Sequence, residues 1–219
     1  MENTILIIAA LLTSTLSAMI GMGGGIILLG LMAMLIPHGY IVIALHGMIQ
    51  LIGNGTRTYV FKNAIKKEIV TKYFFGSLIG LSISLIIVLI LIKLYNVETA
   101  NEIRFDYLKP LIGIYIIWFI YLRKKIQSDK SGNFFLVGII GGLTSVFIGA
   151  VGPLIAPFFL GNQLSKENII ANKAACQIIT HLGKVPIFVF FFNLNYFEYS
   201  TILFPLMISV YIGTNIGKK

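Results

Sequence analysis

Acidic residues are scarce in this sequence and absent from its apolar segments. Asp and Glu together number 8 of 219 residues, and all of them lie at the N-terminus or in polar breaks. Charged residues of both signs make up only 11% of the chain, whereas a soluble domain carries about 25%. Several apolar runs reach the roughly 20 residues that a bilayer-spanning helix needs. The sequence therefore predicts an all-α integral membrane protein.

Cysteine is nearly absent too. Cys176 is the only one, so the chain can form no internal disulfide and no cysteine-based metal site. The apolar segments also lack a carboxylate for general acid–base catalysis, and no metal-ligand spacing occurs. We therefore expect no catalytic residue, no metal and no cofactor. An intramembrane enzyme remains the weaker alternative function.

Basic residues give the chain a formal net charge of +9. Eight of the 17 Lys and Arg residues lie in two short connections, 62–72 and 123–130. Because basic clusters beside membrane spans mark cytoplasmic loops, we place both connections in the cytoplasm and do not expect nucleic-acid binding. No Lys or Arg precedes Arg57, which favours an N-terminus outside the membrane.

The apolar segments divide the chain into single spans and two longer, interrupted runs. The single spans are 40–61, 70–94, 107–122, 168–193 and 197–216, and the interrupted runs are 4–36 and 134–160. The interruptions read GMGGG at 21–25 and GAVGP at 149–153. The loop charges require each interrupted run to begin and end on the same side, as a V-shaped hairpin. Non-helical backbone inside a membrane must line a cavity or be buried in protein.

The chain also repeats itself, because the second Gly motif begins 128 residues after the first. The helix after each motif carries four polar residues at spacings of 4, 4 and 3: His46, Gln50, Asn54 and Arg57 in the first, Lys173, Gln177, His181 and Lys184 in the second. We predict two membrane repeats, 1–127 and 128–219, the second inverted and lacking its last span. This is the plan of many secondary transporters.

Two cations, Arg57 and Lys184, lie inside apolar segments that hold no carboxylate. A cation in a low-dielectric interior needs a partner, and the simplest candidate is an anion that comes and goes. The sequence thus predicts an anion transporter working by alternating access, with an anion channel as the alternative. Lys173 lies near the end of its segment, so we expect its amine to reach the lipid headgroups.

The polar stripes and the Gly-rich breaks together form the predicted binding site. Each stripe stays within about 80° of one helix face, and a half-helix beginning at a break points free N–H groups at an anion. The predicted substrate-binding residues are His46, Gln50, Asn54, Arg57, Gln177, His181, Lys184, Gly23, Gly24, Gly25 and Gly152. The two stripe histidines are open to two interpretations, proton coupling or hydrogen bonds between helices. Coupling to sodium also stays open.

Four stretches resemble the TauE/SafE sulfite exporter family, also described as the four-TMS sulfite/organosulfonate permeases. They are GMGGGIILL, ALHGMIQLIGNGTRTYVFKNAI, GGLTSVFIGAVGPLIAPFFL and ANKAACQIITHLGKVPIFVF. The resemblance covers nearly the whole chain. It implies a bacterial or archaeal inner-membrane permease with two inverted halves, which moves sulfur-containing anions such as sulfite or sulfoacetate. The GAVGP motif has fewer glycines than is usual in that family, and the final span is missing.

Overall fold

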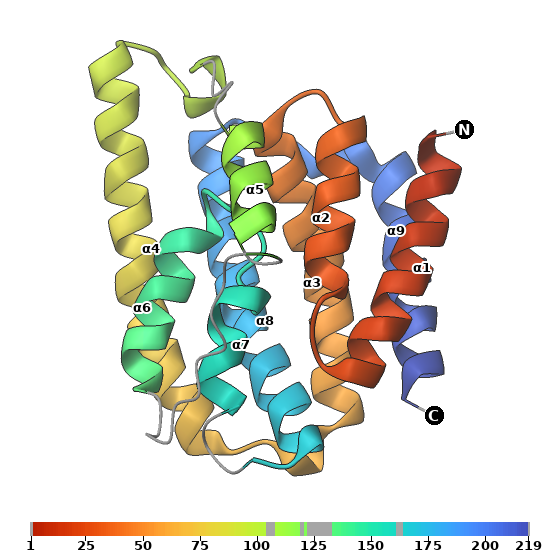
Figure 1. Cartoon of the computed structure of the whole chain (residues 1–219). Helices are drawn as coiled ribbons and strands as arrows, with labels where there is room; N and C mark the ends of the chain where they lie inside the picture. Colours follow the sequence, from red (N-terminus) through yellow and green to blue (C-terminus); the bar gives the residue numbers. More distant parts are fainter. Residues whose placement is uncertain (1, 104–107, 119–120, 122–132, 161–163, 219) are drawn as a thin grey trace.

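Every regular element in the described part of the chain is a helix. The protein is seen in a computed structural model that describes residues 2–103, 108–118, 121, 133–160 and 164–218 (Figure 1). The α-helices are α1 (Glu2–Ile20), α2 (Gly24–Leu35), α3 (Gly39–Val60), α4 (Lys67–Tyr95), α5 (Leu108–Ile117), α6 (Phe134–Ser145), α7 (Gly152–Leu160), α8 (Lys166–Phe191) and α9 (Ser200–Gly217). Short 3-10 helices are η1 (Lys62–Ala64), η2 (Ala100–Glu102) and η4 (Tyr196–Tyr199).

Four of the helical segments are long and apolar enough to cross a bilayer: Asn3–Ile20, Lys67–Tyr95, Lys166–Phe191 and Tyr196–Gly217. Large aliphatic side chains stay exposed along the outer faces, among them Ile86 and Ile90 on α4 and Ile208 on α9. A surface this apolar is unfavourable in water and suited to lipid tails. The chain is therefore a multi-pass membrane protein, which confirms the class that its composition predicts.

Both long apolar runs fold as interrupted hairpins. The first breaks between α1 and α2, where Gly21 and Gly23 have φ of 84° and 98°. The second breaks between α6 and α7, where Gly149 has φ of 85°. Side chains are strained at such positive φ angles, so glycine permits the sharp change of direction. Figure 1 shows the two hairpins pointing opposite ways, the first bending toward the end that holds the C-terminus and the second toward the end that holds the N-terminus.

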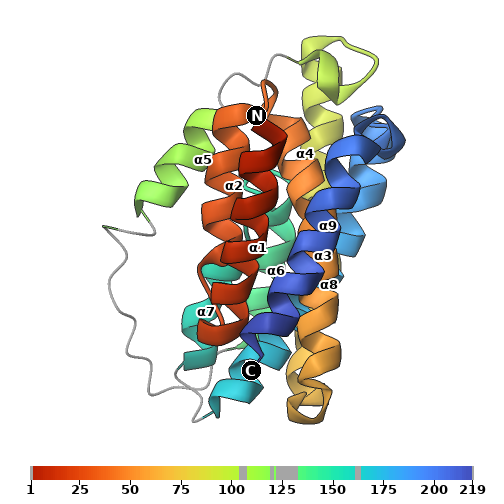
Figure 2. The same ribbon diagram turned by 90° about the vertical axis from the view of Figure 1, so that its right-hand side faces the viewer.

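The centre of the bundle is the pair α3 and α8, which pack against each other. Helix α9 packs on α3 and also pairs with α1, while α4 packs on α8 and also pairs with α6. Figure 2 shows α9 running beside both α1 and α3. Each interrupted hairpin thus packs against a long helix from the other half of the sequence.

Small residues let α4 and α6 approach backbone to backbone. A Cβ atom on Gly76 would overlap the carbonyl oxygen of Phe135, and one on Gly142 would overlap that of Ser77. Ser84 Oγ donates a hydrogen bond to the Leu143 carbonyl at 2.8 Å. Because lipid tails are as apolar as the helices, close packing and hydrogen bonds must hold membrane helices together.

Asparagine side chains fix the start of α8 against the connection between α3 and α4. Ser165 caps α8 in a reciprocal arrangement with Asn168. Asn168 Nδ2 donates to the Ala64 carbonyl at 2.7 Å, and Asn172 Oδ1 accepts from the Lys66 amide at 2.7 Å. The register of α8 along α3 is therefore set at one end of the bundle.

The predicted span 107–122 corresponds in part to α5, which packs on α2 and α3. Tyr115 on α5 donates its hydroxyl to the Ala150 carbonyl at 2.9 Å, so α5 also supports the second break. The basic connection 123–130 and the boundary between the predicted repeats lie outside the described residues.

We expect Gly76→Ala to lower the thermal unfolding temperature in detergent, because its methyl group would strike the α6 backbone. Overpacking of this kind costs about 1–3 kcal/mol. Gly55→Ala is the matched control, since a Cβ on this α3 glycine meets nothing within 4 Å, and alanine favours a helix by up to about 1 kcal/mol. An unfolding temperature for Gly76→Ala at or above that of Gly55→Ala would contradict the packing.

Candidate functional site

The α3 stripe points into the bundle, as its spacing predicts. His46, Gln50, Asn54 and Arg57 are all buried, and Arg57 is only 5% exposed. Arg57 Nη2 donates to Asn54 Oδ1 at 2.8 Å and to Gln50 Oε1 at 3.5 Å. Neutral amide oxygens, and not carboxylates, therefore hold the guanidinium in place.

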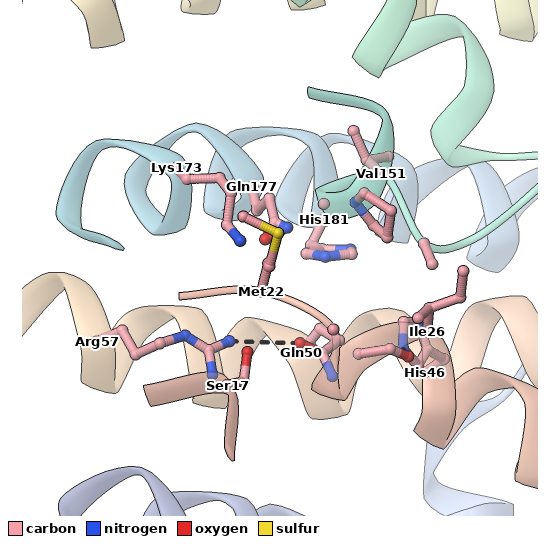
Figure 3. A pocket seen from close by; sticks show the side chains of 15 residues that line it. Ser17, Met22, Ile26, His46, Gln50, Arg57, Val151, Lys173, Gln177 and His181 are labelled. Atoms are coloured by element: carbon pink, nitrogen blue, oxygen red, sulfur yellow. Dashed lines mark hydrogen bonds between the residues drawn. The ribbon is translucent and has the colours of Figure 1, made fainter. Parts of the chain in front are cut away.

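The α8 stripe faces the α3 stripe. Lys173, Gln177, His181 and Lys184 are all buried. Figure 3 shows Lys173, Gln177 and His181 opposite Arg57, Gln50 and His46, with Met22 from the first break between them. The prediction that Lys173 reaches the lipid headgroups is wrong. This residue is only 6% exposed, because its Nζ turns inward and donates to the Gly21 carbonyl.

The two stripes and the two breaks enclose a cavity. Its volume is about 20 Å³, measured as the space open to the centres of water-sized molecules. A volume of this size holds one or two waters. Its lining residues are Ser17, Met22, Gly23, Gly25, Ile26, His46, Gln50, Arg57, Ala150, Val151, Gly152, Pro153, Lys173, Gln177 and His181. Residues far apart in the sequence thus meet at one point, where the predicted site residues gather.

Two half-helices begin at this cavity. Helix α2 starts at Gly24 and α7 at Gly152, and the first N–H groups of a helix carry a partial positive charge. A glutamine lies beside each start, since a Cβ on Gly25 would sit 3.4 Å from the Gln50 amide and one on Gly152 2.7 Å from that of Gln177. The α7 end offers fewer donors, because Pro153 has no N–H.

Two cations line this cavity, and none of the described residues that line it is acidic. Arg57 and Lys173 are both among the lining residues. Across the described ranges, the sole ion pair joins Lys72 and Glu68, which lie on the exposed surface of α4. The cavity therefore combines full positive charge, helix N-termini and amide groups in a buried setting. Such a donor set suits an anion with several oxygens.

Lys184 is buried at 0% exposure but is not among the residues that line the cavity. Its Nζ donates to the carbonyl oxygens of Ile43 at 3.1 Å, Ser145 at 3.4 Å and Gly149 at 3.5 Å. Gly47 on α3 makes room for it, because a Cβ there would overlap Cε of Lys184. The ammonium of Lys184, one of the two cations from which the sequence predicts an anion, thus donates to three backbone carbonyls.

Two other predicted site residues are also not among those that line the cavity. Asn54 holds the Arg57 guanidinium, and Gly24 packs against the Thr13 carbonyl of α1. The remaining predicted residues all line the cavity: His46, Gln50, Arg57, Gln177, His181, Gly23, Gly25 and Gly152.

Sequence reasoning missed Lys173, although its position in the second stripe was a usable signal. It also missed Ser17 of α1 and apolar lining residues such as Met22 and Val151. Nothing in the sequence distinguishes these from ordinary packing residues, because they reach the cavity only through the bends of the two hairpins.

A second hollow lies between the ends of α3 and α9 and has a volume of about 590 Å³. Tyr59, Lys62, Tyr211 and Lys218 contribute to its walls. Lys62 and Lys218 are exposed, and Lys62 Nζ lies 5.3 Å from the centre of the Tyr59 ring. Solvated lysines beside tyrosines are common at a membrane surface, so this hollow is a weaker candidate than the buried cavity.

We expect Lys184→Met to lower the thermal unfolding temperature far more than Lys166→Met. Loss of the ammonium leaves buried carbonyls unsatisfied, at about 1–3 kcal/mol for each group. Lys166 is exposed in the first turn of the same helix and serves as the control. Thermal unfolding of the two purified variants in detergent measures the difference, and equal temperatures would refute this role for Lys184.

Comparison with known proteins identifies the family of this chain. The sequence model of the family described as "Sulfite exporter TauE/SafE" matches residues 6–219. No curated protein and no solved structure matches the chain significantly. The family match spans both hairpins, both polar stripes and the cavity between them. This protein therefore belongs to the TauE/SafE family of sulfite exporters, a family of membrane transporters and not of enzymes.

Proposed function

We propose that the protein is a secondary transporter of small sulfur-containing anions, sulfite or a small organic sulfonate, which binds in the cavity between the two breaks. The observation that carries this proposal is the pair Arg57 and Lys173, both buried at the cavity, with no carboxylate among the described residues that line it. A permanent structural ion pair would have placed an acid there. An anionic substrate supplies the missing negative charge each time it binds.

The lining suggests how such an anion is held. The Arg57 guanidinium offers a planar fork of N–H donors that suits two oxygens of one anion. Lys173 approaches from the opposite side on α8, where its bond to the Gly21 carbonyl can be exchanged for one to the substrate. Gln50 and Gln177 present amide groups beside the starts of α2 and α7. Together with the first N–H groups of α2 and α7, these side chains of α3 and α8 surround the anion from four different elements.

Alternating access completes the proposal. In the present conformation the cavity has about 20 Å³ for water-sized centres, less than an anion with three oxygens needs. Loading and release therefore require the two sides to separate, one at a time. A permanently open anion channel fits a cavity of this small volume less well.

We further propose that residues 1–127 and 128–219 are inverted repeats that rock against each other. Three observations support this. Positive-φ glycines recur at Gly21 and Gly149. The hairpins point in opposite directions (Figure 1). The helix pairs α1–α9 and α4–α6 mirror each other about the central pair α3–α8.

We expect Arg57→Gln and Lys173→Met each to abolish the rise in unfolding temperature that sulfite gives the purified wild-type protein. A ligand at a hundred times its Kd adds about 2.7 kcal/mol to the folding free energy, and losing a charged partner in a buried site removes most of that. Lys166→Met is the matched control on α8 and should respond like wild type.

The same variants should lose sulfite uptake in proteoliposomes. Counter-flow exchange and a saturating flux in the wild type would identify a carrier, while a flux that never saturates would identify a channel. An unchanged sulfite response in both Arg57→Gln and Lys173→Met would refute the site.

The proposed orientation places the protein in the inner membrane with 62–72 and 123–130 in the cytoplasm and the N-terminus outside. We expect a membrane-impermeant maleimide to label Glu98→Cys on intact cells, and Lys62→Cys only after permeabilisation. Both positions are exposed. The background is Cys176→Ala, which removes the buried native cysteine. Labelling of Lys62→Cys on intact cells would overturn this orientation.

A further inference from the structure

Two histidines from different helices face each other at the cavity. His46 on α3 and His181 on α8 have ring centroids 6.4 Å apart and planes inclined at 76°. Each residue is 1% exposed, and both line the cavity (Figure 3). A buried imidazole normally has both nitrogens satisfied, because an unpaired buried polar atom costs free energy.

These rings do not follow that rule. His46 Nε2 lies 2.8 Å from the Gly25 carbonyl oxygen. A carbonyl can only accept, so Nε2 carries the hydrogen and Nδ1 of the neutral ring holds a free lone pair. Within the described ranges, neither Nδ1 of His46 nor Nδ1 of His181 has a hydrogen-bond partner. By hydrogen-bond geometry each ring therefore retains a buried nitrogen without a partner, although the Gly149 carbonyl also acts on the His46 ring.

The charges around the rings explain why a proton would arrive only with an anion. Lys184 acts electrostatically on both rings, and Arg57 acts on His181. Lys173 is a third cation at the same cavity. Each positive charge near a ring opposes a further one on it, which favours neutral imidazoles until a negative charge offsets the field.

No buried carboxylate on the described helices around the cavity competes with the histidines for a proton. Helices α2, α6 and α7 carry no titratable side chain, and α1 carries only Glu2 at its far N-terminal end. The remaining buried titratable groups of the packed elements are neutral: Tyr73 on α4, Tyr115 on α5 and Cys176 on α8. With Arg57, Lys173 and Lys184 already cationic, the histidine pair is the group left to accept a further proton among the described residues of the cavity.

We propose that the His46–His181 pair binds a proton together with the anion, which makes the coupling ion of transport a proton and not sodium. This inference rests on the proposed function of the same cavity. Anion and proton stabilise each other there, and by linkage each must raise the affinity for the other by the same factor. The pair bridges α3 and α8, so the proton resides at the contact between the two halves that are proposed to rock.

The test is isothermal titration of the purified protein with sulfite in two buffers of different ionisation enthalpy, which gives the protons taken up per anion bound. We compare wild type with His46→Gln, His181→Gln and His38→Gln. Glutamine keeps a donor for the Gly25 carbonyl but cannot bind a proton. His38, the third histidine of the chain, precedes α3 and is not among the lining residues, so it is the matched control.

We expect wild type and His38→Gln to take up on the order of one proton more per anion than His46→Gln or His181→Gln. Ionisation of sulfite itself is common to all four proteins, so the difference between them reports the histidines. The apparent affinity of wild type should also rise as the pH falls toward 5, with a shallower dependence in the two cavity variants.

The outcomes distinguish a failure of the histidine inference from a failure of the proposed function. If wild type binds sulfite with no more proton uptake than the cavity variants, the histidine inference fails while the proposed function stands. If wild type does not bind sulfite at all, the proposed function fails first. If both cavity variants fail to fold, as judged by size exclusion, the pH dependence of wild-type affinity for a small organic sulfonate, which stays ionised over this range, decides instead, and a flat profile overturns the inference.

Discussion

The architecture depends on ammonium groups that are held inside the bundle by backbone carbonyls. Lys173 and Lys184 both project from α8, and each donates to the carbonyl of a positive-φ glycine, Gly21 in the first break and Gly149 in the second. An interrupted helix leaves carbonyls that no N–H of its own satisfies, and such groups are costly in a membrane. One helix therefore satisfies both breaks, and in doing so brings the two hairpins to one place.

The carbonyl contacts also distinguish Lys184, which lies away from the cavity, from Lys173, which lines it. Lys184 meets three carbonyls from α3, α6 and the second break, which leaves it no free donor for a substrate. Lys173 meets one carbonyl and also borders the cavity. Arg57 is held by amide oxygens that cannot neutralise it. Carbonyls and amides satisfy hydrogen bonds but leave the net charge in place, so the cavity keeps its attraction for an anion.

Glycine serves two physical purposes in this chain. At the breaks it permits positive φ, which side chains adopt only with strain. In the helices it permits close contact, as where Gly47 admits the Lys184 side chain and Gly76 admits the α6 backbone. The first purpose forms the cavity, and the second fixes the helices that carry its side chains.

The sequence by itself determined the class of protein, both helix breaks and the two polar stripes, because hydropathy, glycine motifs and helical spacing are local properties. It could not decide which lysine lines the cavity. Lys173 and Lys184 are 11 residues apart, about three helical turns, and so lie on the same face of α8. What separates them is the backbone opposite each one, and this depends on how α8 lies along α3 and between the hairpins. Only the tertiary structure sets that register, through contacts such as Asn172 with Lys66 that join residues distant in the chain.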